Sequence, residues 1–227
     1  MIESAINDLM ALLPIPGPPA QEREVADFLH QTFVAMGIPD GQIQYDNAQA
    51  QSEYGGNVGN MIVTIPGRLP GAPLMFSTHM DTVPDCVGCQ PRLDRERNRI
   101  VNDAPTALGG DNRAGCAILV TLARELMKLD GNHPTIVLVF FIQEEVGLVG
   151  ARGLDTSLLG EQLPEMCVNL DGGRVEEVVT AVIGSQRFTI DITGVAAHAG
   201  SRIAEGVSAA VIASIPIAEL AEGGWHG

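Results

Sequence analysis

The sequence of 227 residues predicts an α/β fold, with a central, mostly parallel or mixed sheet and helices on both faces, followed by the start of a small α+β domain. Strand-like apolar runs alternate with helical runs through most of the chain. The run Thr135 to Ile142 is β-branched and aromatic without alternation, as in a strand covered on both faces. From Arg187 to Thr193 the pattern changes to alternation, typical of an antiparallel strand with one wet face. We therefore divide the chain into a first domain, residues 1–184, and an incomplete second domain, residues 185–227.

The elements expected in the first half are bounded by proline or glycine, which end regular structure. Helical spacing of apolar residues predicts helices, and short apolar or alternating runs predict strands. In order, these are a helix over Ile2 to Leu13, a helix from about Gln21 to Met36, a strand over Asn60 to Ile65 and a strand over Leu74 to Thr78.

The second half begins with a loop-rich segment, residues 85–107, and then follows the same alternation. A glycine-rich turn leads into a helix whose apolar stripe indicates that one face is buried. The expected elements are a helix from about Arg113 to Leu129, strands over Thr135 to Ile142 and Met166 to Leu170, the alternating strand Arg187 to Thr193, and a helix over Val207 to Leu220 interrupted by Pro216.

Composition excludes several classes of function. The formal net charge of −15 argues against a nucleic-acid partner, because phosphate binding needs clustered Lys and Arg. The longest strongly apolar run, Ile136 to Ile142, is far too short to cross a bilayer, so no membrane partner is expected. The first residues lack the basic start and apolar core of a secretion signal, which favours a cytoplasmic location.

Acidic and imidazole side chains follow the predicted strands at the point where each strand ends. His79 and Asp81 follow one strand, and Glu144 and Glu145 follow another. Asp171 follows a third strand, and Asp111 lies in the glycine-rich turn before a helix. Ligand sites of α/β sheets collect beyond the carboxyl ends of the strands. Each motif also has an ordinary interpretation, such as a helix-capping Asp, an exposed acidic pair or a hydrogen-bonded His.

Metal binding is the natural reason for these groups to converge, because packed carboxylates without cations would repel one another. A mixed His, Asp and Glu set suits zinc, with manganese or cobalt as less favoured ions. One carboxylate can also bridge two ions. Successive side chains of an extended segment point in opposite directions, so one of Glu144 and Glu145 can bind metal while the other acts as a general base. Asp81 can orient His79 as a ligand.

Five motifs in this order resemble those of the M20 family of metallopeptidases, and most closely its peptidase T (tripeptide aminopeptidase) branch. They cover nearly the whole chain. They are Thr78-His79-Met80-Asp81-Thr82-Val83-Pro84, Gly109-Gly-Asp111-Asn112-Arg-Ala-Gly115, Gln143-Glu144-Glu145-Val-Gly147, Asn169-Leu-Asp171-Gly-Gly and Ala197-His198-Ala-Gly200.

The resemblance implies a zinc-exopeptidase type of fold and a two-zinc centre. His79 and Asp171 would bind one zinc, Glu145 would bind the other, and Asp111 would bridge them. The peptide bond between Asp111 and Asn112 is expected to be cis. Residues 1–184 would be the catalytic domain, without its C-terminal return segment, and residues 185–227 the first part of a lid domain that forms homodimers.

The resemblance also implies roles in the hydrolysis of short peptides, with a tripeptide aminopeptidase activity expected. Glu144 would be the general base, and Asp81 would support His79. His198 would contact the substrate and stabilise the tetrahedral intermediate, in dimeric relatives from the partner subunit.

Three departures from the family pattern bear on activity. A further histidine ligand of the second zinc, near the C-terminus of longer relatives, has no counterpart here, and His226 does not match it. Ile203 stands where a proline is usual, and Pro216 lies inside the expected lid helix. We therefore expect a C-terminally truncated chain. One alternative is an inactive remnant that binds at most one metal or a partner. Another is a metal-dependent carboxypeptidase or N-acyl amino acid amidohydrolase.

Overall fold

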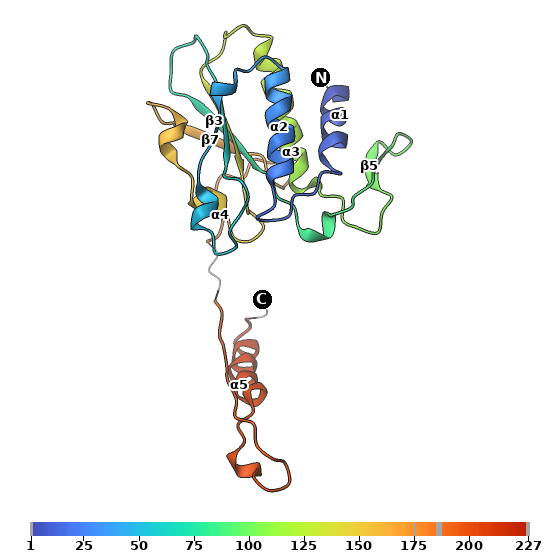
Figure 1. The fold of residues 1–227 in the computed structure, drawn as a ribbon, viewed down its shortest axis with the longest axis vertical. Coiled ribbons are helices and arrows are strands. Elements are labelled where there is room, and N and C mark those ends of the chain that lie inside the picture. The colour runs from blue at the N-terminus through green and yellow to red at the C-terminus, as the bar shows by residue number, and fades with distance from the viewer. Residues whose placement is uncertain (1, 175, 185–187, 226–227) are drawn as a thin grey trace. The chain divides into compact units, whose positions relative to one another are not determined.

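The computed structural model describes residues 2–174, 176–184 and 188–225, so Arg187 and His226 lie outside the described residues. The chain divides into two compact units, Met1–Glu176 and Glu177–Gly227 (Figure 1). The expected division into domains 1–184 and 185–227 stays a prediction.

The first unit is built on a mixed five-stranded sheet with the order β1-β2-β6-β3-β7. β1 pairs antiparallel with β2, and β2 with β6, whereas β3 lies parallel to both β6 and β7. The α/β class and the mixed sheet are therefore confirmed. The strands are β1 (Ile43–Tyr45), β2 (Met61–Ile65), β3 (Leu74–His79), β6 (Ile136–Phe141) and β7 (Met166–Asn169).

Three long helices pack side by side on one face of this sheet: α1 (Ile2–Leu12), α2 (Arg23–Ala35) and α3 (Gly110–Met127) (Figure 1). Alternate strand residues point toward them, so Leu138 and Phe140 of β6 join the main core with Leu29 and Phe33 of α2.

Helices were expected on both faces, and the second face differs from this expectation. A smaller core there joins Val137 and Val139 of β6 to Leu159, which lies in a 3-10 turn, Thr156–Leu159. The short helix α4 (Val149–Arg152) precedes this turn. Among the described residues of the first unit, the three long helices therefore all cover the first face. The segment between β6 and β7 places only short helical turns near the second.

The structure adds an antiparallel hairpin where only a loop was expected. β4 (Pro91–Asp94) pairs with β5 (Arg99–Asn102). The connecting turn contains Asn98 in the left-handed region, at φ 49°. Asn tolerates that conformation, but a charged turn without glycine gives only a weak hairpin signal in a sequence.

The second unit contains a long helix, α5 (Ala209–Glu222), which follows the N-cap residue Ser208 and continues through Pro216. Ser208 Oγ caps it by accepting a hydrogen bond from the Val211 amide at 3.3 Å. Residues 188–193 are not in a strand, although their alternation predicts one. A strand needs a partner for its backbone groups, and the described part of this unit provides only the isolated bridge between Val195 and Val207.

No described helix combines the length and the apolar character needed to cross a bilayer.

Candidate metal centre

The parallel strands bring the predicted metal ligands to one edge of the sheet. His79 ends β3 and lies opposite Phe141, the last residue of β6. Glu144 follows β6 three residues later, and Asp171 follows the end of β7 at Asn169 by two residues. Because these strands run in the same direction, the segments that follow them meet beside His79.

Asp111 comes to the same place from the start of α3. Gly109 precedes it in the left-handed region, at φ 76°, and the peptide bond between Asp111 and Asn112 is cis, as the resemblance implies. The Asn112 side chain donates a hydrogen bond to the carbonyl oxygen of Leu170 at 2.6 Å and accepts one from the Gly115 amide at 2.9 Å. Asn112 therefore ties the Asp111 turn directly to the residue before Asp171.

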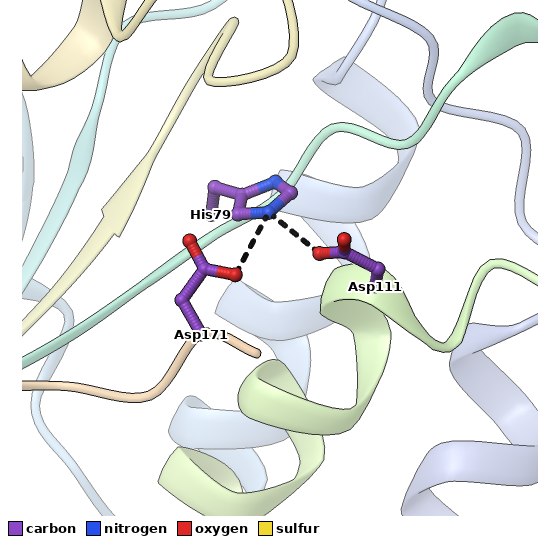
Figure 2. A group of neighbouring side chains, drawn as sticks. All are labelled: His79, Asp111 and Asp171. Carbon is purple, nitrogen blue, oxygen red and sulfur yellow. Dashed lines mark hydrogen bonds and ion pairs between the residues drawn. The ribbon is translucent and has the colours of Figure 1, made fainter. Parts of the chain in front are cut away.

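Three side chains form a group that can hold a metal ion: His79, Asp111 and Asp171 (Figure 2). One ligand atom from each lies within 4.8 Å of the other two. His79 Nε2 is 3.1 Å from Asp111 Oδ1 and 3.9 Å from Asp171 Oδ1. Glu144 lies beside this group, with its Oε2 4.0 Å from the same nitrogen. Asp111 is 70% exposed and His79 only 2%, so the group is anchored in the core and open on one side.

Asp81 is fully buried and contacts both His79 and the Glu144–Glu145 segment. Its backbone oxygen lies 3.0 Å from His79 Nδ1, and its Oδ1 lies 3.3 Å from the same nitrogen. Its two carboxylate oxygens accept hydrogen bonds from the amides of Glu144, at 2.9 Å, and Glu145, at 3.1 Å. A single carboxylate therefore positions the imidazole and the acidic pair together.

Burial and charge at the site together shift the pKa of His79, Glu144 and Glu145. Burial alone would lower the pKa of His79, but the hydrogen bond and charge of Asp81, with the charges of Asp171 and Glu144, raise it to about 9. Burial raises the pKa of Glu144, and the nearby carboxylates add to this shift while His79 opposes it. Burial likewise raises the pKa of Glu145, with Asp111 as the next largest cause.

The residues present fit a divalent metal ion of the zinc type. The carbonyl oxygen of Asp81 only accepts hydrogen bonds, so His79 Nδ1 carries a proton and the neutral ring leaves Nε2 free as a ligand. That nitrogen faces two carboxylates, and a mixed nitrogen and oxygen set is a common set for zinc. Packed acidic groups that raise one another's pKa are also relieved by a cation.

Besides Asp81 and Glu144, two further predicted residues lie outside this group of three. Glu145 follows Glu144, and its carboxyl is close enough to Asp111 for that charge to raise its pKa, but it is not among the clustered ligand atoms of the described residues. His198 belongs to the second unit, where its Nδ1 accepts a hydrogen bond from the Gly200 amide at 3.1 Å.

Sequence reasoning missed three residues beneath the site. Gln143 is fully buried and has a φ of 51°. Arg113 is buried, and its guanidinium donates to the carbonyl oxygens of Met80 and Ile15. Glu22 is fully buried. Gln143 and Arg113 lie within the motifs, which was the available signal. Glu22 is an ordinary acidic residue at the start of a helix, and nothing local predicts its burial.

A cavity of about 230 Å³ opens beside the metal centre. His79, Glu144 and Asp171 form part of its lining, and Phe141 and Leu148 are among its apolar residues. The cavity therefore combines the charged edge of the sheet with an apolar surface.

Comparison with known proteins places this geometry in a family. A model of peptidase family M28 matches residues 60–214. The chain is 28% identical over 215 residues to an uncharacterized protein, YqjE, of Bacillus subtilis (strain 168), covering 95% of this chain and 56% of that protein. It is 28% identical over 227 residues to a peptidase T of Clostridium botulinum (strain Loch Maree / Type A3), covering 84% of this chain and 51% of that protein.

A solved structure gives the same relationship. The crystal structure of aminopeptidase PepT from Bacillus cereus ATCC 10987 is 30% identical, with a TM-score of 0.72, and the match covers 95% of this chain and 56% of that chain. The chain thus spans about half the length of these relatives. The expected resemblance to peptidase T-like metallopeptidases is confirmed, although the matching family model is described as M28 where the motifs suggested M20. Because that model covers more than half of the sequence and all the clustered residues, the chain belongs to peptidase family M28 and has a peptidase T-like metallopeptidase fold.

Proposed function

We propose that this chain carries the metal centre of a zinc-dependent exopeptidase that hydrolyses short peptides, acting as an aminopeptidase on tripeptides. The observation that carries the proposal is the convergence of His79, Asp111 and Asp171 on one position, with Glu144 beside them. The names of the similar proteins, peptidase T and aminopeptidase PepT, support this choice of substrate class.

The proposal assigns the metal ligands as follows. His79 and Asp171 would hold one zinc ion, Glu145 would hold a second, and Asp111 would be shared between the two. When bound, zinc supplies a Lewis acid that polarises a carbonyl group and makes a water molecule more acidic.

Glu144 is the proposed general base. Its carboxyl lies beside the metal ligands, and burial together with the neighbouring carboxylates raises its pKa, which makes it a stronger base. Glu144 takes a proton from water as the water oxygen attacks the peptide carbonyl carbon. It then gives that proton to the amine nitrogen as the carbon–nitrogen bond breaks. The Asp81 carboxylate holds Glu144 in place by accepting a hydrogen bond from the Glu144 backbone amide.

The second unit contributes His198 in this proposal. Because His198 Nδ1 accepts a hydrogen bond from Gly200, the proton of the neutral ring is on Nε2. An N–H donor of this kind suits an oxyanion, which supports the proposed role in stabilising the tetrahedral intermediate. A homodimer through this unit is part of the proposal, since it would supply His198 from the partner subunit.

Metal content and peptide hydrolysis test the proposal together. The 227-residue chain is loaded with zinc, its metal content is measured, and hydrolysis of a free-amine tripeptide is followed. We expect Glu144→Gln to lower kcat by at least about 100-fold with the metal content unchanged. Glu161→Gln, the same change at an exposed glutamate outside the metal centre, is the matched control and should retain wild-type rates.

A second candidate function is a domain that binds one metal ion without turnover. One observation favours it: Glu145 is not among the clustered ligand atoms, so the described group surrounds a single position. Two ions per chain with tripeptide hydrolysis would exclude this candidate. One ion or none, with no hydrolysis, would instead show that these residues do not suffice for the enzyme.

Substrate class is decided by a small panel. Free-amine tripeptides are compared with N-blocked peptides and N-acyl amino acids at equal zinc loading. Preference for the free amine supports the aminopeptidase proposal. Preference for a blocked peptide with a free C-terminus, or for an N-acyl amino acid, would instead indicate a carboxypeptidase or an amidohydrolase.

A further inference from the structure

Three successive amides after β6 donate hydrogen bonds to two buried carboxylates. The Gln143 amide donates to Glu22 Oε1 at 3.0 Å. The amides of Glu144 and Glu145 donate to the two oxygens of Asp81 at 2.9 and 3.1 Å. Three backbone hydrogen bonds therefore hold the segment that carries Glu144 and Glu145, and Glu22 accepts the first of them.

Glu22 is placed for this contact by the segment before α2. It precedes α2 as its N-cap residue, but its side chain makes no capping hydrogen bond. The carboxyl instead turns into the core, where Oε1 also accepts a hydrogen bond from the Ala20 amide at 3.1 Å. Oε2 is buried without a hydrogen-bond partner among the described residues. Burying a carboxyl oxygen without a hydrogen-bond partner costs free energy. Helix capping does not explain this burial, because the Glu22 side chain makes no capping hydrogen bond.

Gln143 is the residue through which this contact reaches the site. Its φ of 51° is unfavourable for a residue with a side chain. Hydrogen bonds to its side chain and to its backbone hold it in this conformation. Its side-chain amide donates to the Gly55 carbonyl oxygen at 2.8 Å and accepts from Ser52 Oγ at 2.5 Å. Its backbone oxygen accepts from the Val149 amide at 3.1 Å. Loss of the Glu22 contact would leave a buried, unpaired N–H at the turn that aims Glu144.

We infer that Glu22 is a positioning residue for the Glu144–Glu145 pair and acts through the Gln143 amide. Its catalytic meaning rests on the proposed function, whereas its structural effect does not. Among the described residues, the Glu22 side chain makes hydrogen bonds with the Ala20 and Gln143 amides and none with His79, Asp111 or Asp171, so its direct contact with the site is through the segment after β6.

Hydrogen exchange of the metal-free 227-residue chain tests the inference directly. In Glu22→Ala, we expect amide exchange in residues 142–149 to accelerate at least about tenfold, because an unpaired amide destabilises this turn. Exchange in the α3 segment 119–126 should stay at the wild-type rate. Glu22→Gln keeps an acceptor oxygen of the same reach and should stay within about threefold of wild type.

A matched control separates this local effect from general destabilisation. Asp8 is a partly buried acid outside the site, paired with Arg124 at 2.8 Å between α1 and α3. Asp8→Ala should accelerate exchange in the α3 segment at least as much as in residues 142–149. If Glu22→Ala does not fold, Glu22→Asp, which shortens the side chain by one methylene, is measured in its place with the same local pattern expected.

Two results would overturn the inference. One is wild-type exchange of residues 142–149 in the shortened variants, and the other is equal acceleration of residues 142–149 and α3.

In zinc-loaded protein with tripeptide, we expect Glu22→Ala to lower kcat at least about tenfold with KM nearly unchanged, and Glu22→Gln to restore it. If the wild-type chain shows no hydrolysis, the proposed function fails while the exchange result still decides the role of Glu22.

Discussion

At the scale of single residues, His79 uses its two ring nitrogens differently. Nδ1 faces Asp81 inside the core, and Nε2 faces the carboxylates of Asp111 and Asp171. Without metal, the hydrogen bond and charge of Asp81 and the charges of Asp171 and Glu144 outweigh the effect of burial and raise the pKa of His79 to about 9. A metal ion and a proton therefore compete for Nε2.

This competition predicts proton release when zinc binds. At pH 7, metal-free His79 is protonated, because its pKa lies above the solution pH, and binding should release about one proton from it. At pH 9 about half of this release remains. Calorimetric titration with zinc in buffers of different ionisation enthalpy measures the number, with His79→Ala as the control. Binding without proton release at pH 7 would show that His79 is not the ligand.

Glu22 makes a separate prediction for stability in the metal-free chain. Burial is the largest cause that raises its pKa, from 4.5 to about 7. The folded state therefore holds a proton that the unfolded state has released, and the stability contributed by this group is lost as pH rises from 4.5 through 7. The loss amounts to about 3 kcal/mol.

Urea unfolding at pH 5 and pH 8 measures this loss as a difference between wild type and Glu22→Gln. The contribution of His79 to the free energy of unfolding also falls as pH rises through its own raised pKa, but this fall is the same in wild type and variant. The variant should show the smaller decrease. Equal pH dependence of wild type and variant would contradict the raised pKa of Glu22.

At the scale of elements, α3 approaches the sheet closely at Gly115. A Cβ added there would lie 2.6 Å from the Leu170 carbonyl oxygen and would also meet Thr78 Oγ1 and Asn112 Oδ1. These three residues adjoin His79, Asp171 and Asp111 in the sequence. The close approach of helix and strands at this glycine therefore sets the spacing of the metal centre.

Gly115→Ala should therefore destabilise the chain by about 1–3 kcal/mol and weaken zinc binding, because the helix start must move away from the strand ends. Gly41→Ala is the matched control, since a Cβ at Gly41 meets nothing within 4 Å, and its effect should stay within about 0.5 kcal/mol. Thermal unfolding and zinc titration measure both effects. Unchanged zinc affinity in a destabilised Gly115→Ala would separate helix packing from the metal centre.

The same elements show what the sequence predicts and where it stops. Hydrophobic periodicity predicts the α/β class and the long strands. Motif order, and the rule that the carboxyl ends of parallel strands lie at one edge of the sheet, predict the convergence of His79, Asp111 and Asp171. The strand expected over 187–193 does not form in residues 188–193, because alternation cannot supply a pairing partner. The burial of Glu22 depends on segments that meet only in the folded chain, so no local pattern in the sequence predicts it.

At the scale of the whole molecule, the two units differ in how much they bury. Residues 136–140 of β6 are all buried, whereas α5 contains no buried residue. Apolar side chains of α5, including Ile215 and Ile217, are more than half exposed. Local stability follows buried contacts, so the two units should open with different free energies.

Amide exchange at low protein concentration should therefore be at least about 100-fold faster in α5 than in β6. Protection of α5 that increases with protein concentration would support the proposed homodimer through this unit. Protection of α5 equal to that of β6 in a chain shown by light scattering to be monomeric would contradict the difference in burial.

The metal centre is tested most directly by the position of zinc in a crystal of the zinc-loaded chain, located by anomalous scattering at the zinc edge. We expect an ion at about 2.0–2.2 Å from His79 Nε2 and from carboxylate oxygens of Asp111 and Asp171. We also expect this ion to be lost in His79→Ala. Zinc bound elsewhere at full loading, with these three side chains free of it, would show that His79, Asp111 and Asp171 are not the metal ligands.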